Sequence, residues 1–171
     1  MTVPVIDHVH APGSGRIGIV HCPGTRAGGL FGGDGAALDA DLATLVQWGA
    51  AALVTLLQPY ELTLLGVEDL GARANALGLE WHHLPVTDGA APGAAFEAAW
   101  AETGPSLHAR LDAGGRIVVH CRAGIGRSGA LAARLLVERG LAPGDAIVAV
   151  RRVRPGAIES PEQNQWVRRR G

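Results

Sequence analysis

The sequence predicts one α/β domain with a mainly parallel central sheet flanked by helices. Short β-branched and apolar runs alternate with longer segments in which apolar residues recur at helical spacing, a pattern typical of parallel sheets covered by helices. Hydrophobic residues make up 47% and charged residues 18% of the 171 residues, which is enough to build a sizeable core. Because no repeat and no linker interrupts the chain, we expect residues 1–171 to form a single domain.

A β-hairpin and a glycine-rich loop are the first elements expected along the chain. Residues 3–9 and 16–20 are short β-branched runs, and the turn residues at 11–15 separate them. The glycines of residues 24–35 then exclude regular structure. Leucine and valine recur at helical spacing in residues 39–48, which predicts the first helix.

Three more strands are expected, with helices between and after them. Residues 52–57 form a continuous apolar run, as expected for a strand covered on both faces, and further strands are predicted at 79–86 and 116–120. The remaining helices are predicted at residues 67–77, 96–113, 127–139, 144–152 and 160–170. A break is expected at Gly104 and Pro105, since proline inside a helix removes a backbone hydrogen bond.

The segment that carries chemistry is the glycine-rich turn between the strand at 116–120 and the helix at 127–139. Backbone N–H groups of such a turn, at the positive end of a helix dipole, favour a dianion of the size of phosphate. We therefore expect substrate phosphate to bind to Arg122, Ala123, Gly124, Ile125, Gly126 and Arg127.

Cys121 and Arg127 stand at the two ends of this turn. The amides and the dipole that bind phosphate also favour a thiolate, which makes Cys121 a candidate nucleophile. The planar guanidinium of Arg127 can hold two phosphoryl oxygens at once. We expect His120 to orient the turn by hydrogen bonding to the backbone, and Ser128 to donate to the sulfur as it leaves.

The pattern His120-Cys121-x5-Arg127-Ser128 resembles the signature of the cysteine-dependent protein tyrosine and dual-specificity phosphatases. A strand before the motif and a helix after it are the context that the signature requires, and both are predicted. The resemblance implies a dual-specificity phosphatase-like fold and hydrolysis of phosphomonoesters on a protein substrate through a phosphocysteine intermediate. It implies no metal ion and no cofactor.

Two further segments are similar to the kinase-associated, cyclin-dependent-kinase-inhibitor-type phosphatases. Residues 81–92 resemble the acid loop of that group, which makes Asp88 the general acid, although Asp-Gly is also a common turn. Residues 154–163 match the region that presents a glutamine to the hydrolytic water, which indicates Gln163. Residues 160–163 also match a capping box with proline at the first helical position. A helix cap therefore explains the glutamine at position 163 equally well.

The same residues also bear on two alternative functions. A rhodanese-type sulfurtransferase has a similar loop, but that loop is typically one residue shorter than the five residues between Cys121 and Arg127. A noncatalytic phosphate-binding module is disfavoured, because Asp88 and Ser128 are present as well. Arg122 adds positive charge beside the turn, which keeps a phosphoinositide substrate open.

Composition argues against nucleic acid and membranes as partners. A net charge of −1 gives no positive field for a phosphate backbone or an anionic surface. No apolar run is long enough for membrane insertion, and residues 1–7 lack the pattern of a signal peptide. We expect a cytoplasmic protein.

Several other residues are expected to be structural. Cys22 is expected to be a buried thiol, with a resolving role toward oxidised Cys121 as the alternative. Asp7, His8 and His10 resemble a metal-binding strand, but structural histidines are the preferred interpretation. The arginines at residues 168–170 are expected to form a solvated helix end.

Overall fold

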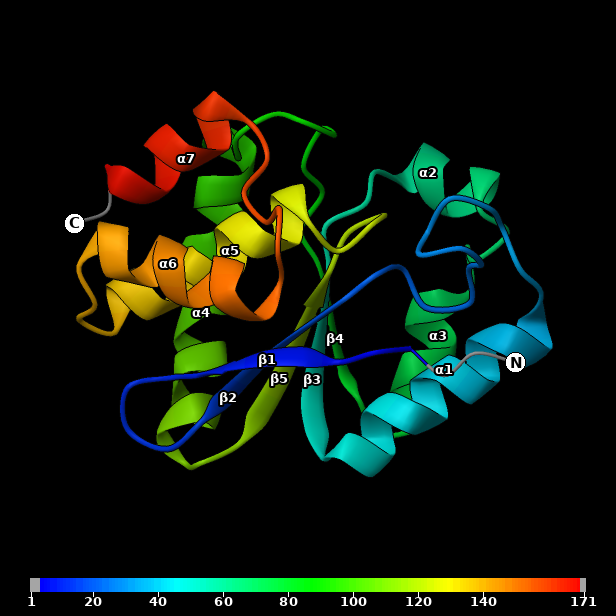
Figure 1. Ribbon diagram of the computed structural model, residues 1–171. Helices are drawn as coiled ribbons and strands as arrows, with labels where there is room; N and C mark the ends of the chain where they lie inside the picture. Colours follow the sequence, from blue (N-terminus) through cyan, green and yellow to red (C-terminus); the bar gives the residue numbers. More distant parts are fainter. Residues whose placement is uncertain (1–3, 170–171) are drawn as a thin grey trace.

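The structure is a computed structural model that describes residues 4–169 (Figure 1). Within these residues five strands form one sheet in the order β1-β2-β5-β3-β4. The strands are β1 (Asp7–His10), β2 (Arg16–Val20), β3 (Ala50–Thr55), β4 (Glu80–His83) and β5 (Arg116–His120). Only the pairing of β1 with β2 is antiparallel; the other pairs are parallel. The predicted α/β class with a mainly parallel sheet is confirmed.

Helices cover both faces of the sheet (Figure 1). One face carries α4 (Ala94–Asp112), α5 (Gly126–Glu138), α6 (Pro143–Val153) and α7 (Pro161–Arg168), and the other carries α1 (Gly35–Trp48) and α3 (Leu70–Ala76). Side chains of the central strand alternate between the two cores: Ile117 and Val119 pack under α4 to α7, and Val118 packs under α1 and α3. No helix within residues 4–169 is long and apolar enough to cross a membrane.

The predicted break in the fourth helix is wrong, because α4 continues through Gly104 and Pro105. The proline cannot donate to the carbonyl of Ala101, but both residues are exposed, so water can satisfy that carbonyl. Trp100 and Leu107, on either side of the proline, are buried and hold the two halves of the helix against the sheet.

A short helix was not predicted from the sequence, namely α2 (Pro59–Leu64). It begins with Pro59 and a capping box between Gln58 and Glu61. The other predicted elements are present with ends shifted by a few residues. Residue 3 and residue 170, at the ends of the first predicted strand and the last predicted helix, lie outside the described residues.

The parallel strands direct their carboxyl ends to one edge of the sheet, where the loops that follow them meet. These loops are residues 21–34 after β2, 56–58 after β3, 84–93 after β4 and 121–125 after β5. All candidate site residues except Gln163 lie in these loops, at the end of β5 or in the first turn of α5.

Candidate active site

The loop after β5 turns its carbonyl groups away from its centre. The carbonyl of Arg122 accepts a hydrogen bond from the N–H of Cys22 at 2.9 Å, and that of Ile125 accepts from the N–H of Ile158 at 3.1 Å. The N–H and C=O of a trans peptide point in opposite directions, so the loop directs N–H groups inward. The N-terminus of α5 completes a cradle for an anion.

Arg154 holds two more of these carbonyls. Its Nη2 donates to the carbonyl of Ala123 at 3.0 Å, and its Nε donates to that of Gly124 at 2.9 Å. Its Nη1 bonds to Asp7 at 2.8 Å. Asp7, which the alternative metal site would have used, is therefore paired with an arginine. Within residues 4–169 no group of three or more His, Cys, Asp or Glu side chains is arranged to hold a metal ion.

Cys121 follows β5 directly and is only 3% exposed. Its Sγ lies 3.3 Å from the Oγ of the buried Ser128, which is the distance that donation from the hydroxyl to sulfur requires. Gly124 shapes the loop around the sulfur, since it has φ 69° and a Cβ there would come within 2.4 Å of the Val20 carbonyl oxygen. The candidate nucleophile therefore lies in a tightly formed loop.

His120 connects the cradle to the sheet through a chain of hydrogen bonds. Trp81 Nε1 donates to Thr55 Oγ1, Thr55 bonds to His120 Nε2 at 2.7 Å, and His120 Nδ1 bonds to the Cys121 carbonyl at 3.1 Å. Burial lowers the pKa of His120 to about 4, and the charge of Arg127 acts in the same direction. The ring is neutral near pH 7 and makes the contacts that an orienting role requires.

Arg127 is 2% exposed, and Glu61 of α2 compensates its charge. Nη1 and Nη2 donate to the two carboxylate oxygens of Glu61 at 2.8 and 3.0 Å, and Nη1 also donates to the Val86 carbonyl. Arg127 Nε is buried without a partner among residues 4–169. Nε, on the edge that it shares with Nη2, is thus left for a ligand. Burial alone would raise the pKa of Glu61, but hydrogen bonds from Arg127 and the Gln58 N–H hold it below its ordinary value.

Asp88 lies in the loop after β4, with Oδ1 3.4 Å from Arg127 Nη2 and a side chain that is 61% exposed. It borders a pocket of about 380 Å³ at the mouth of the cradle. The other residues lining this pocket are Ala27, Gly28, Gly29, Leu30, Arg122 and Ala123. Asp88 can therefore reach both the cradle and solvent, as a proton donor to a leaving group must.

Arg122 connects the cradle to the glycine-rich loop after β2. Its Nε donates to the Gly29 carbonyl at 3.1 Å, and its Nη2 donates to the Leu30 carbonyl at 3.2 Å. The sequence predicted that this guanidinium binds substrate phosphate. In the structure two of its nitrogens instead hold Gly29 and Leu30, which line one wall of the pocket.

Gln163 is fully buried and caps α7. Its Oε1 accepts from the N–H groups of Glu159 and Ser160 at 3.0 and 3.2 Å, which confirms the capping box. Its Nε2 donates to the Ala90 carbonyl at 3.4 Å, two residues beyond Asp88. The amide thereby touches the acid loop as well as the helix.

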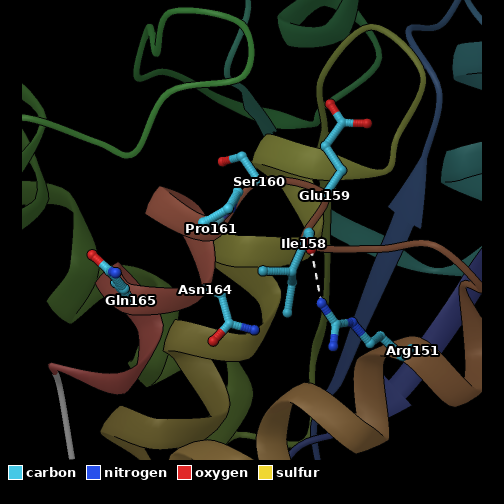
Figure 2. Close-up of a pocket in the computed structure, with 7 residues that line it drawn as sticks. All are labelled: Arg151, Ile158, Glu159, Ser160, Pro161, Asn164 and Gln165. Atoms are coloured by element: carbon cyan, nitrogen blue, oxygen red, sulfur yellow. Dashed lines mark hydrogen bonds between the residues drawn. The ribbon is translucent and has the colours of Figure 1, made fainter.

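A strained residue precedes this cap. Ile158 has φ 60°, a left-handed conformation that is unfavourable for a β-branched side chain. Arg151 stabilises it by donating to the carbonyls of Ala157 and Ile158, both at 2.9 Å. Figure 2 shows the second bond beside the pocket that Arg151 and Ile158 border. Since the Ile158 N–H bonds to Ile125, the strained segment links the cradle to Gln163.

Cys22 is buried, as predicted, and its thiol donates to the Pro23 carbonyl. Burial raises the pKa of this thiol far above its ordinary value, and the neighbouring Cys121 acts in the same direction. The thiol is therefore protonated at neutral pH.

Two residues of the site were missed in the sequence, Glu61 and Arg154. For Glu61 the capping box with Gln58 and the proline at the first helical position were available as signals. For Arg154 the match of residues 154–163 marked the segment but not this role, because its bonds to the cradle depend on how α6 ends beside β1 and the loop.

Both the sequence and the fold of the chain resemble those of known phosphatases. A family model described as "Polymorphic toxin system, DSP-PTPase phosphatase" matches residues 27–141. The chain is 40% identical over 58 residues to the tyrosine-protein phosphatase CDC14 of Candida albicans, covering 33% of this chain and 10% of that protein. It is 39% identical over 80 residues to protein tyrosine phosphatase type IVA 3 of Mus musculus, covering 46% of this chain and 44% of that protein.

The fold resembles that of a kinase-associated phosphatase in which the catalytic-site cysteine is replaced by serine. The TM-score is 0.84 at 24% identity, covering 98% of this chain and 93% of the other. The chain spans about half the length of the curated relatives it matches, or less. These matches confirm the resemblance read from the cysteine motif and do not favour a sulfurtransferase. Because the family model covers more than half of the sequence, the chain belongs to the DSP-PTPase phosphatases described for polymorphic toxin systems.

Proposed function

We propose that this chain is a phosphoric monoester hydrolase that dephosphorylates a phosphorylated protein. The observation that carries the proposal is the cradle itself: its carbonyls are bonded outward, Cys121 lies at its base, and Nε of buried Arg127 has no partner among residues 4–169. The pocket in front is lined by no aromatic side chain among residues 4–169. A mouth without an aromatic wall would accept phosphoserine and phosphothreonine as well as phosphotyrosine.

The proposed reaction proceeds in two displacements. In the first, the thiolate of Cys121 attacks phosphorus, the bond from phosphorus to the leaving oxygen breaks, and Asp88 gives its proton to that oxygen. Arg127 donates from Nε and Nη2 to the equatorial oxygens while the loop amides stabilise their charge.

In the second displacement water attacks the phosphocysteine. Asp88, now ionised, takes a proton from the water, and the bond from sulfur to phosphorus breaks. Ser128 donates a hydrogen bond to the departing thiolate of Cys121. Gln163 is proposed to orient the water, for which its contact with the acid loop at Ala90 is the support. We also propose a cytosolic location, which two buried free thiols suit.

The proposal is tested with Cys121→Ser and a matched control, Cys22→Ser. Wild type and Cys22→Ser should release phosphate from an activated aryl phosphate and from phosphopeptides, and Cys121→Ser should release none, because a serine hydroxyl stays protonated in this cradle. Acid quench followed by mass spectrometry should find a phosphoryl group on Cys121. Appreciable hydrolysis by Cys121→Ser, or sulfur transfer from thiosulfate by wild type, would contradict the assignment.

A further inference from the structure

Four large apolar side chains are exposed beside the mouth of the cradle. Leu30 and Phe31, in the glycine-rich loop after β2, are 59% and 61% exposed, and Tyr60 and Leu64, on α2, are 65% and 68% exposed. We call these four side chains the apolar rim. Exposed apolar surface that is grouped in this way is typical of binding sites.

Helix α2 departs from the usual amphipathic pattern on its exposed side. Tyr60 and Leu64 are four residues apart, so they lie on the same side of the helix, and that side faces solvent. Glu61 and Leu62 are buried, with Glu61 directed to Arg127 of the cradle. A surface helix normally exposes polar residues and buries apolar ones, so the outward apolar pair needs a reason other than folding.

The two segments that carry the rim lie against each other. A Cβ on Gly32 would come within 2.8 Å of the Leu65 carbonyl oxygen, so the backbone of the loop lies directly against the end of α2. Phe31 and Leu64 are the chain neighbours of these two residues. Figure 1 shows the loop and α2 side by side at the end of the sheet where the cradle lies.

Leu30 connects the rim to the mouth of the cradle. It lines the pocket of about 380 Å³ together with Asp88 and Arg122. Its carbonyl accepts a hydrogen bond from Arg122 Nη2, and a Cβ on Gly29 would come within 1.9 Å of the Arg122 carbonyl oxygen. Leu30 is thus fixed to the cradle by a hydrogen bond from the Arg122 side chain and by the close approach of the Gly29 and Arg122 backbones.

We propose that the apolar rim binds apolar side chains that flank the phosphorylated residue of a protein substrate. The inference rests on the proposed function and deepens it by naming the recognised sequence. The occupant must extend from the phosphate in the cradle across the pocket to α2 and must carry apolar groups. A peptide with leucine or phenylalanine beside its phosphorylated residue has both properties. A sugar phosphate carries no apolar group, and in a phosphoinositide the polar inositol ring separates the ring phosphate from the acyl chains. Exposed aromatic and aliphatic anchors next to a charged pocket are typical of protein recognition.

The test measures peptide binding apart from turnover. In the Cys121→Ser background, fluorescence anisotropy gives the Kd of two phosphotyrosine peptides that differ only in whether leucine or serine flanks the phosphotyrosine. We expect the leucine peptide to bind about tenfold more tightly. The substitutions Phe31→Ser, Tyr60→Gln and Leu64→Gln together should remove this preference. Leu30 is left intact because it lines the mouth.

A matched control uses Leu77→Gln and Val148→Gln, two exposed apolar residues that are not part of the rim. This variant should retain the preference of about tenfold. Equal Kd values for the two peptides, or a preference that survives the rim substitutions, would overturn the proposal. So would a dimer, found by analytical ultracentrifugation, that the rim substitutions dissociate, because a second copy would then be the occupant. Hydrolysis of an aryl phosphate by the same variants with Cys121 restored reports separately on the proposed function.

Discussion

Among single residues, Arg127 has to be buried and yet remain able to bind an anion. A buried guanidinium without a counter-charge would be strongly destabilising, and one bonded on every edge could not take up phosphate. Glu61 resolves this by occupying the edge formed by Nη1 and Nη2, which leaves Nε without a protein partner and free to donate to an anion. The carboxylate is therefore as much a part of the candidate site as the arginine.

Glu61→Gln should lower the free energy of unfolding by about 3–5 kcal/mol at neutral pH, since it leaves a buried charge unpaired. The pKa of Glu61 is lowered in the folded state from an ordinary value of 4.5. The contribution of ionised Glu61 to the free energy of unfolding is therefore complete above about pH 4.5. This contribution is lost as the pH falls through the folded-state pKa. Urea denaturation should show the gap between wild type and variant narrowing below about pH 4.5. Glu68→Gln, at an exposed position, is the control; a gap that is constant with pH would contradict the assigned ion pair.

Asp88→Asn separates the acid role from the turn role, because asparagine also favours turns and the side chain is 61% exposed. A general acid matters most when the leaving oxygen is basic. The variant should therefore lose about 10²–10⁴-fold in kcat with phosphopeptides and much less with a highly activated aryl phosphate. Steady-state kinetics over a series of aryl phosphates with different leaving groups measures this. An equal loss with every substrate would make Asp88 a turn residue, and the acid would have to be sought elsewhere.

Among the elements, the glycine-rich loop after β2 contributes by its close approach to the cradle. Gly28 and Gly29 both have positive φ, but only Gly29 meets the cradle, since a Cβ there would lie 1.9 Å from the Arg122 carbonyl oxygen. A Cβ at Gly28 meets nothing within 4 Å. Alanine at Gly28 should therefore cost only the free energy of a left-handed backbone, whereas alanine at Gly29 should also displace the loop from the cradle.

Gly28→Ala should destabilise the protein by about 1–2 kcal/mol, the cost of a left-handed conformation for alanine. Gly29→Ala should add a steric displacement of the loop from the cradle, so it should be more destabilising and should raise KM for an aryl phosphate. Thermal unfolding and steady-state kinetics measure the two effects. If the two variants lose the same stability and keep the same KM, the contact between loop and cradle has no role in the site.

The elements that the sequence predicted well are those marked by local signals. The strand β5 and the helix α5 were predicted within a residue at each end, because a β-branched run, a glycine-rich turn and a terminal glycine border them. The helix α2 was missed because six residues are too few to show a hydrophobic period. The break at Pro105 was predicted wrongly because tertiary packing of Trp100 and Leu107 outweighs the local cost of the proline.

At the scale of the whole molecule, the sheet order decides which distant residues reach the cradle. The contiguous motif from His120 to Ser128 could be predicted from the sequence, because its geometry depends on neighbouring residues only. Arg127 and Glu61 are 66 residues apart and Arg154 and Ala123 are 31 apart, so their contacts exist only once β3, β5 and α6 are in place. A sequence pattern does not encode such pairs, since their spacing depends on the loops and helices between them.

Because the cradle is assembled from so many segments, the unfolded chain has no phosphate site, and phosphate should stabilise the native state. A ligand that binds only the native state adds about 2.7 kcal/mol at a concentration of 100 Kd, which for a chain of this length raises Tm by about 5–10 °C. Phosphate also stabilises proteins nonspecifically, so the shift has to be compared between variants in the same buffer.

Cys121→Ser keeps the loop amides and Arg127, so it should show the full shift in Tm on addition of phosphate. Arg127→Met removes the Nε donor and should retain only the nonspecific part, whatever its own starting Tm. Differential scanning calorimetry over a series of phosphate concentrations measures both. Equal shifts in the two variants would mean that phosphate does not bind in the cradle, and the inward N–H groups would then have to be explained by the packing of α5 alone.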